Sequence, residues 1–597
     1  MNTLEHEVLK GGEFLVKPTM YQTVFIPEDA TEEDLMIRDM VVDFVDNEVI
    51  PNTKQIENQE NNIAARLLEK AGELGILGVH MPEEFGGMNL STNTNTLVAE
   101  KMGRSGSFTV TYAAHTGIGM LPIFYFGTDA QKQHYLPRLI SGQLKACYCL
   151  TEPGSGSDAL AAKTKAILSP DGKNYLLTGN KMWISNSGFA DIFIVFAKVD
   201  GEKFTGFIVE KGSVGLTLGN EEEKMGIHGS STRQVFFENT PVPVENVLGE
   251  IGKGHLIAFN VLNIGRFKLG ALCLGGAKQN FRMAVRYANE RQQFGVNIGS
   301  FGAIKHKLAE QSIRIFALES AQYRVSDMIQ EKIDQNKAKG DDVSHSKLGA
   351  AEEFATECAI LKILGSEYLD FVVDETVQIF GGNGFSEEFP AAKAYRDSRI
   401  NRIYEGTNEI NRLLMVDMLL RRAMKGHINL VDAAWAVQKE LASMPIPSSN
   451  SGTYARELDA IENFKKCVLM VAGAAVKAQM DGQIDLKNEQ EVLMHVADML
   501  TLTFASESIY LRVRKLSDTK KESEMTIYNN ILRTYIQDAN SMMSKHAIEA
   551  LVGFTLGDVQ DVLLRGVTRY TKFKPYNTKV MRREIADFML AANDWAL

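Results

Sequence analysis

The spacing of the apolar residues changes twice along this chain of 597 residues, and that change constrains the fold more than any other feature. Apolar residues recur with helical spacing from about residue 31 to 146. Between 146 and 250, short β-branched and aromatic runs such as DIFIVFAKV and FTGFIVEKG alternate with turns containing Gly, Asn and Pro, as is typical of strands. Helical spacing returns from about 255. The sequence therefore predicts a mostly α protein with a central β domain.

Breaks in this pattern divide the chain into five segments. A chain of this length has room for roughly three or four domains. The Gly-rich stretches GGAKQ and GGNGF are expected to interrupt helices, and a loop is expected at 443–454. The segments are an N-terminal segment (1–30), an N-terminal helical domain (31–146), a middle β domain (147–252), a C-terminal helical domain (253–428) and an additional helical domain (429–597).

The first helix has a recognisable start. Thr31 is followed three residues later by Asp34, a pairing that favours a helix N-cap. Pro51 is expected to end the run.

Composition excludes several classes of protein. The chain has 64 basic and 75 acidic residues, a net charge of -11, which argues against a general nucleic-acid binder. The five cysteines are scattered along the chain, which indicates a reducing compartment. The acidic N-terminus resembles neither a signal peptide nor a transit peptide. We therefore expect a cytoplasmic, bacterial-type location. The eleven histidines include no pair at ligand spacing backed by carboxylates, so no metal is expected.

An apolar stripe follows one face of the predicted helix over 455–480. The two interpretations that remain open are the core of a helical bundle and, because lysines flank the stripe, a surface for peripheral contact with an inner membrane or a partner. The stripe consists of Leu458, Ile461, Phe464, Val468, Val471 and Ala475.

Five short motifs carry the chemical information. They are CYCLTEPGSGSD (147–158), GNKMWISN (179–186), YANERQQFG (287–295), QIFGGNGF (378–385) and RIYEGTNEI (402–410). A Gly/Ser turn alone is a weak signal. In this order, however, the five motifs resemble those of the acyl-CoA dehydrogenase family over about residues 30–425. The GGEF near the start, NIGR (263–266) and the C-terminal extension resemble the very-long-chain branch.

The resemblance implies a fold and a reaction. The expected architecture is an N-terminal helical domain, a middle β-barrel and a C-terminal four-helix bundle, followed here by the additional helical domain. The expected reaction is FAD-dependent α,β-dehydrogenation of long-chain fatty acyl-CoA to trans-2-enoyl-CoA in fatty acid β-oxidation, with electrons passed to electron-transferring flavoprotein. A flavin is needed because no side chain accepts a hydride.

Each motif then receives an expected role. Glu405 resembles the base that removes the α-proton, and Gly265 precedes Arg266 where family exceptions carry an alternative base. The substrate-binding candidates are Ser157, Asn263, Arg266 and Gly406. Thr151 is expected near the flavin N5, with Trp183 covering the ring. The cofactor-binding candidates are Tyr148, Cys149, Leu150, Thr151, Ser157, Trp183, Ile184, Ser185, Arg291, Gln293, Phe294, Gln378, Ile379, Phe380, Gly381, Gly382, Thr407, Asn408 and Glu409.

Two further expectations concern assembly and chain length. Arg291 and Gln293 resemble residues that reach the FAD of a neighbouring subunit, which implies a homodimer. The segment 109–119 resembles the helix at the far end of the acyl cavity: its small residues Ala113, Ala114, Gly117 and Gly119 leave room for a long tail that Tyr112 closes.

Two alternative functions compete with this interpretation. An acyl-CoA oxidase performs the same desaturation but returns electrons to oxygen. A non-catalytic assembly or scaffold protein would keep the fold and lose the chemistry.

Overall fold

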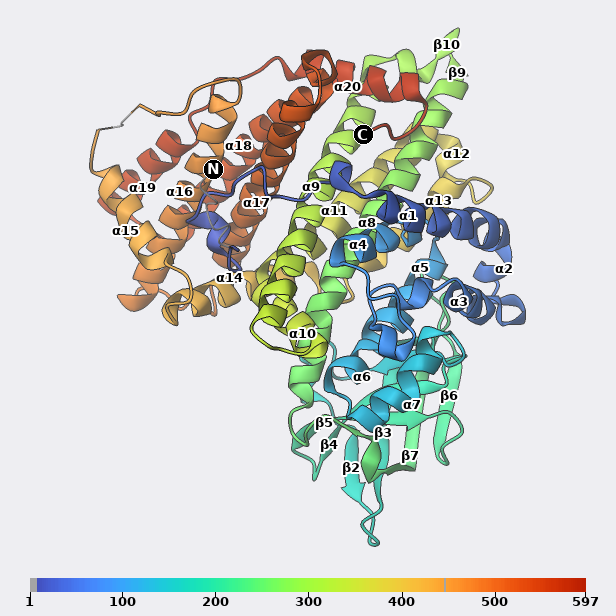
Figure 1. Cartoon of the computed structure of the whole chain (residues 1–597). Coiled ribbons are helices and arrows are strands. Elements are labelled where there is room, and N and C mark those ends of the chain that lie inside the picture. The colour runs from blue at the N-terminus through green and yellow to red at the C-terminus, as the bar shows by residue number, and fades with distance from the viewer. Residues whose placement is uncertain (1–7, 445–446) are drawn as a thin grey trace.

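The structure is a computed structural model that describes residues 8–444 and 447–597. Figure 1 shows the large sheet at the bottom, a central group of long helices above it, and a second group of helices, orange to red, at the left. The blue N-terminal helices lie beside the central group and above the strands. The predicted order of helix, strand and helix is confirmed, and so is the additional helical domain.

The N-terminal helices begin where predicted. The Thr31 hydroxyl accepts a hydrogen bond from the Asp34 N–H at 3.2 Å, which caps α1. The prediction that Pro51 ends the run is wrong: the π-helix η3 (Val45–Val49) and the 3-10 helix η4 (Ile50–Asn52) carry the chain on into α2. Pro51 is tolerated because a proline in a first helical turn lacks only an N–H that needs no partner. The helices are α1 (Glu32–Phe44), α2 (Thr53–Glu57), α3 (Ile63–Glu73), α4 (Thr92–Met102), α5 (Ser107–Ala113), α6 (Leu121–Phe126) and α7 (Asp129–Ile140), with the π-helix η8 (Ala114–Gly119) between α5 and α6.

The middle segment forms one eight-stranded sheet with the order β6-β7-β3-β2-β4-β5-β8, in which β1 pairs with β4. The described strand pairs leave β6 and β8 at the two edges, so the expected barrel is an open sheet. The central strand β4 is buried along almost its whole length. The strands are β1 (Ala146–Cys149), β2 (Lys165–Leu168), β3 (Asn174–Ser185), β4 (Ile192–Val199), β5 (Lys203–Glu210), β6 (Leu216–Glu221), β7 (Thr232–Pro243) and β8 (Val247–Leu248).

Long helices form the centre of the molecule. The predicted interruption at GGNGF is confirmed, but the one at GGAKQ is wrong, because α8 runs through it. Gly275 packs directly on the backbone carbonyl of Glu100, so its missing side chain allows α4 and α8 to approach closely. By length and composition α8 could cross a membrane, but 67% of its apolar window is buried inside the molecule, as in a core helix. The elements are α8 (Gly254–Glu290), β9 (Gln292–Gln293), β10 (Val296–Asn297), α9 (Gly302–Ala338), α10 (Val343–Glu353), α11 (Ala355–Phe380), α12 (Gly382–Phe385), α13 (Pro390–Ser398), η12 (Arg399–Arg402) and α14 (Asn408–Met424).

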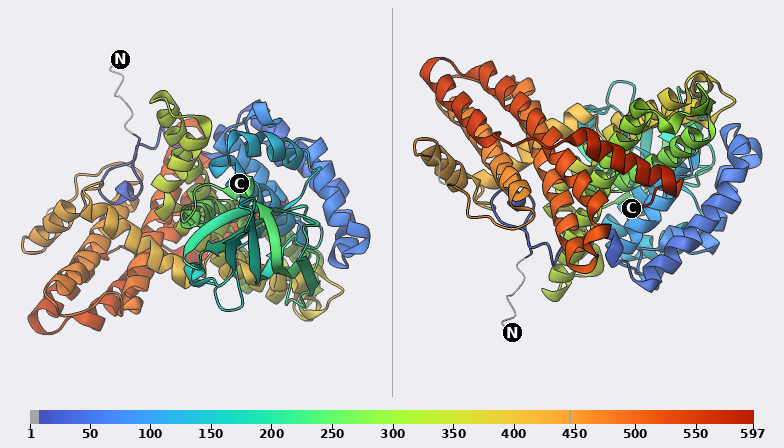
Figure 2. Two further views of the ribbon diagram at one scale, coloured as in Figure 1. Left: turned by 90° about the horizontal axis from the view of Figure 1, so that it is seen from below. Right: turned by 90° about the horizontal axis from the view of Figure 1, so that it is seen from above.

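The additional domain packs against α9 and α14, and Figure 2 shows it beside the central helices when viewed from below and from above. The predicted loop separates α15 from α16, and its residues 445 and 446 lie outside the described part. Its helices are α15 (Leu430–Leu441), α16 (Ala455–Met480), α17 (Gln490–Thr519), α18 (Thr526–Phe554), α19 (Gly557–Tyr570) and α20 (Thr578–Ala592).

The apolar stripe of α16 is a core face. Ile461, Phe464, Val468 and Val471 are each at most 1% exposed, and α16 packs against α17 and α18. The interpretation of this stripe as a membrane or partner surface is therefore wrong, because other helices of the same chain already cover it.

Candidate active site

Glu405 lies in a sharp turn between η12 and α14. Its φ is +58°, and that of Gly406 is +81°. A left-handed backbone is uncommon for a non-glycine residue and often marks a functional site. The next residue, Thr407, caps α14 by accepting a hydrogen bond from the Ile410 N–H at 3.3 Å. The turn therefore aims the Glu405 side chain away from the helix axis and towards α8.

Gly265 on α8 faces the Glu405 carboxyl group. A Cβ atom at position 265 would lie 2.8 Å from Glu405 Oε2 and 3.0 Å from Oε1. The glycine thus supplies the space that the carboxylate occupies. The sequence has no alternative base at position 265, beside Arg266. The structure agrees with this, because the Glu405 carboxyl group fills the space that a side chain at position 265 would need.

Arg266 holds this turn in place. Its Nε donates to the Glu405 backbone oxygen at 3.2 Å, and its Nη1 donates to Asn263 Oδ1 at 2.9 Å. Asn411 Nδ2 adds a bond to the Gly406 oxygen at 2.7 Å. Arg266 is only 6% exposed, so it is no ordinary solvated arginine. In this structure Asn263 and Arg266 position the turn, and their predicted contact with substrate stays a prediction.

The surroundings of Glu405 suit a base. Burial raises the pKa of its carboxyl group to about 7, against the opposing positive charges of Arg266 and Lys362. Glu405 Oε2 has no hydrogen-bond partner among the described residues. From the sequence we expect the pKa of Glu405 to rise when an acyl chain displaces water. In the structure, burial by the protein itself already raises this pKa.

Glu405 lines a cavity of about 370 Å³. Its wall follows α8 from Gly265 to Met283, 18 residues further on, which corresponds to about 27 Å. One leaflet of a bilayer core, filled by acyl chains, is roughly 15 Å thick. The cavity is therefore long enough for a long acyl chain.

The predicted tail-binding segment lies differently from expectation. Ala113, Ala114 and Gly117 line the cavity, as predicted, together with Lys268 of α8. Gly119 instead packs against Ala146, and Tyr112 lines a separate inner cavity, so neither one shapes the end of the long cavity.

The motifs TEP and WIS meet beside this cavity. The Met182 N–H donates to the Thr151 oxygen at 2.9 Å, which joins the two segments. The register of β3 against β7 shifts between Lys181 and Ile184, and Trp183 within this bulge has φ +58° and is 61% exposed. Ser185 lines the same cavity as Glu405. An exposed indole beside an acid in a cavity fits a large planar cofactor such as a flavin.

Several predicted cofactor residues point their side chains elsewhere. Cys149 and Ile184 lie in the apolar core of the sheet, and Tyr148 and Leu150 lie in the core between sheet and N-terminal helices. Asn408 Nδ2 donates to Ser366 and Glu367 at 3.0 Å each. The charge of Glu405 contributes to raising the pKa of the buried Tyr148, which places that strand near the base. Ser157 is exposed.

The remaining predicted residues form a second group. Arg291, Gln293 and Phe294 lie on the hairpin β9–β10, where Phe294 is 93% exposed. Gln378 to Gly382 end α11, and the Phe380 ring stacks on Tyr287 of α8 with centroids 4.0 Å apart. Added Cβ atoms at Gly381 and Gly382 would meet only open space. Figure 1 shows the hairpin at the opposite end of the molecule from the sheet, so one chain does not bring the two groups together.

Thr407 and Glu409 flank Asn408 beside the base.

Sequence reasoning missed Lys268. Its Nζ donates to Thr116 Oγ1 and lies 4.4 Å from the centre of the Tyr112 ring. Burial lowers its pKa to about 7. The available signal was a lysine inside the otherwise apolar, glycine-rich run that follows Arg266.

Comparison with known proteins agrees with this geometry. Four family models match the chain: the N-terminal domain of acyl-CoA dehydrogenases over 31–143, the middle domain over 147–240, and two C-terminal domain models over 252–420 and 463–569. A probable acyl-CoA dehydrogenase of Bacillus subtilis (strain 168) is 43% identical over 594 residues, covering 99% of each chain. The chain belongs to the acyl-CoA dehydrogenase family.

Two further relatives place it within that family. The very long-chain specific mitochondrial acyl-CoA dehydrogenase of Rattus norvegicus is 44% identical over 358 residues, which are 58% of this chain and 52% of that protein. The crystal structure of a Bacillus anthracis acyl-CoA dehydrogenase complexed with FAD superposes with a TM-score of 0.95 at 44% identity, covering 99% of this chain and 100% of that one. The predicted family, including the C-terminal extension, is confirmed.

Proposed function

We propose that this protein is an FAD-dependent acyl-CoA dehydrogenase that converts long-chain acyl-CoA to trans-2-enoyl-CoA in fatty acid β-oxidation. The observation that carries the proposal is the Glu405 carboxyl group, whose pKa is raised to about 7 and which lines a cavity whose wall follows α8 over about 27 Å. A base with a pKa near the working pH removes a proton most effectively.

The residues around Glu405 have distinct parts in this proposal. Glu405 removes the α-proton, while Arg266 and Gly265 fix the position of its carboxylate. The apolar wall of α8 excludes water from the acyl chain, which keeps the base in a medium of low polarity.

FAD is proposed as the cofactor because Trp183 and Ser185 offer an exposed ring and a polar edge beside the cavity, and because the Bacillus anthracis relative is complexed with FAD. When bound, FAD supplies the acceptor for the β-hydride that no side chain can provide. The exposed hairpin with Arg291 and Phe294 supports a homodimer in which each chain completes the cofactor site of its partner, since these residues lie far from Trp183 in one chain.

Long-chain specificity and electron-transferring flavoprotein as the electron acceptor are parts of the same proposal. The extent of the cavity along α8 and the likeness to the very long-chain specific enzyme of Rattus norvegicus support the first, and the second is what the resemblance of the five motifs implies. An acyl-CoA oxidase would instead produce hydrogen peroxide in air during turnover. A scaffold protein would leave the flavin oxidised when palmitoyl-CoA is added. A cytoplasmic location remains a prediction.

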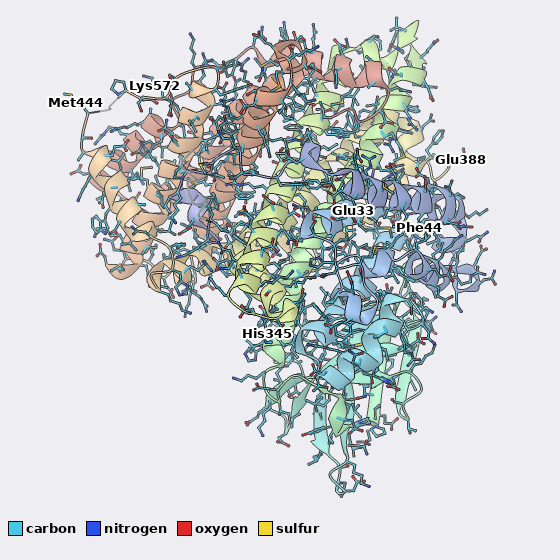
Figure 3. All side chains as sticks on the ribbon, in the orientation of Figure 1. Glu33, Phe44, His345, Glu388, Met444 and Lys572 are labelled. Atoms are coloured by element: carbon cyan, nitrogen blue, oxygen red, sulfur yellow. The ribbon has the colours of Figure 1, made fainter. Side chains whose placement is uncertain are left out.

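The substitution Glu405→Gln tests the proposal. The variant should bind FAD as the wild type does, but palmitoyl-CoA should no longer bleach its flavin absorbance under anaerobic conditions, because an amide cannot accept the α-proton. Glu388→Gln is the matched control, since Glu388 is exposed and projects from the surface in Figure 3. Bleaching of the Glu405→Gln flavin at the wild-type rate would refute the assignment.

A further inference from the structure

A second, smaller cavity lies on the other side of Lys268. Its volume is about 70 Å³, and its walls come from α8, α9, α10, α11 and the N-terminal helices. A water molecule has a share of roughly 30 Å³ in the liquid, so the space suits a group of only a few atoms. Ile264 and Lys268 line both this inner cavity and the long cavity that contains Glu405.

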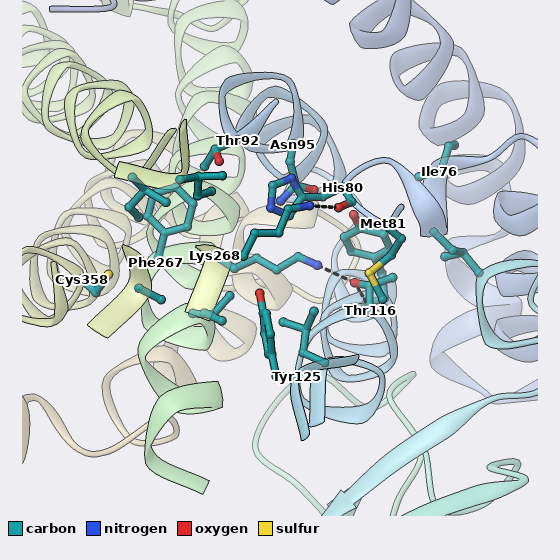
Figure 4. A pocket seen from close by; sticks show the side chains of 18 residues that line it. Ile76, His80, Met81, Thr92, Asn95, Thr116, Tyr125, Phe267, Lys268 and Cys358 are labelled. Atoms are coloured by element: carbon teal, nitrogen blue, oxygen red, sulfur yellow. Dashed lines mark hydrogen bonds between the residues drawn. The ribbon is translucent and has the colours of Figure 1, made fainter. Parts of the chain in front are cut away.

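Two lysines point into the inner cavity, and neither has an acidic partner. Lys268 donates to Thr116 Oγ1, and Lys347 donates to the His80 backbone oxygen; Figure 4 shows these hydrogen bonds as dashed lines. The two lysines are only 8% and 4% exposed. The lining contains no aspartate or glutamate, and the hydrogen bonds of the two lysines within the described residues go to a hydroxyl and a backbone oxygen rather than to an acid. Each ammonium group thus keeps donors without a described partner.

Among the described residues, two of the three other buried lysines are paired with acids, Lys145 with Glu69 and Lys181 with Glu152, whereas Lys362 donates to Asn408. Pairing with an acid is the usual arrangement, because an unpaired buried ammonium group is costly. The cost shows in the inner cavity, where burial lowers the pKa of Lys347 to about 7.

The inner cavity therefore provides a positive potential inside apolar walls. The His80 ring stays neutral and adds no charge, since burial and the nearby lysines lower its pKa. The aromatic ring of Tyr125 and the side chain of Phe267 complete the walls in Figure 4. A carboxylate is the group that matches such a site, because it is small and anionic and can accept a hydrogen bond from each ammonium group.

We propose that the inner cavity binds a carboxylate group between Lys268 and Lys347. Two sources have this chemistry. One is a free small carboxylate. The other, which rests on the proposed function, is the far-end carboxylate of a dicarboxylic acyl-CoA bound in the long cavity. Lys268 lies three residues, about 4.5 Å, along α8 from Gly265. A six-carbon acyl chain spans a similar distance beyond its α-carbon, with bonds of about 1.5 Å each.

The test uses the FAD-loaded enzyme and three variants. Lys268→Met and Lys347→Met remove one ammonium group each while keeping the length of the side chain. Lys337→Met is the matched control, because Lys337 is exposed but close enough to lower the pKa of Lys347. One arm measures the melting temperature in sodium acetate against sodium chloride of the same ionic strength. The other measures the ratio of kcat/KM for hexanedioyl-CoA to that for hexanoyl-CoA.

We expect carboxylate binding to be visible in the wild type and in Lys337→Met, either as a higher melting temperature in acetate or as a higher ratio of kcat/KM for hexanedioyl-CoA to that for hexanoyl-CoA. A rise in melting temperature with acetate that Lys347→Met loses would identify a free carboxylate as the ligand. A fall of about tenfold in the kcat/KM ratio in Lys347→Met would identify the substrate tail, since one charge-assisted hydrogen bond is lost.

If neither readout differs between wild type and the Lys268→Met and Lys347→Met variants, the inference is overturned. Failure of palmitoyl-CoA to reduce the flavin of the same preparation would count against the proposed function instead, and the acetate arm would then decide the inference alone.

Discussion

The substitution Gly265→Ala is the sharpest probe of the candidate base, because it changes the site by one methyl group. The new Cβ would lie 2.8 to 3.0 Å from three atoms of the Glu405 carboxyl group. Real Cβ atoms do not approach that closely, so the carboxylate must move by several tenths of an ångström or more. Misplacement of a catalytic group by about 1 Å can cost on the order of 100-fold in rate. We expect kcat to fall by about 10- to 100-fold.

The fold should survive this change. Position 265 lies inside α8, where alanine is favoured over glycine by roughly 1 kcal/mol. Gly276→Ala serves as the matched control, because it is in the same helix and its added Cβ would meet its nearest neighbour at 3.4 Å, an ordinary contact. The assay is anaerobic flavin reduction by palmitoyl-CoA in a stopped-flow instrument, together with thermal unfolding of both variants.

The outcome is informative in either direction. A slow Gly265→Ala enzyme with normal stability and a normal Gly276→Ala enzyme would support the close approach of base and helix. A Gly265→Ala enzyme that reduces its flavin within about threefold of the wild-type rate would refute the reasoning, since a displaced carboxylate could not then be the base.

Two further predictions concern the cavity and the charge of the base. Gly117→Val should fold, because an added Cβ there meets only open space, but it should shift the chain-length profile of flavin reduction towards shorter acyl-CoA. The folded pKa of Glu405, about 7, lies above its ordinary value of 4.5, so stability is lost as the pH rises from about 4.5 to 7. Urea unfolding should therefore find Glu405→Gln more stable than wild type at pH 8, by up to about 3 kcal/mol, with little difference at pH 4. The kcat/KM of the wild type should rise through pH 7; a profile that is flat from pH 5 to 9 would contradict the raised pKa.

The parts of the fold that depend on local pattern were predictable. Strand runs such as 192–199 alternate with turn residues, and a capping pair such as Thr31 and Asp34 acts within one helical turn. The sequence could not show that GGAKQ lies within a continuous helix. A glycine costs roughly 1 kcal/mol in a helix, but Gly275 is retained because α4 packs where its side chain would be. That contact joins residues far apart in the chain.

The same limit applies to the charged residues of the site. A lysine or arginine in a helix is usually solvated, and no local pattern distinguishes Arg266 or Lys268 from that majority. Their burial follows from the packing of α8 against the turn at Glu405 and against η8. Motif resemblance located Glu405, whereas the tertiary structure shows what holds it and what its backbone conformation is.

The prediction for 109–119 was wrong in part for a different reason, namely the type of helix. Helical spacing of 3.6 residues predicts which residues share a face. Residues 114–119 instead form the π-helix η8, in which each turn contains an extra residue. The wider turn keeps Ala113, Ala114 and Gly117 on the cavity but rotates Gly119 towards Ala146. Thr116 of the same π-helix accepts a hydrogen bond from Lys268, which lines both cavities.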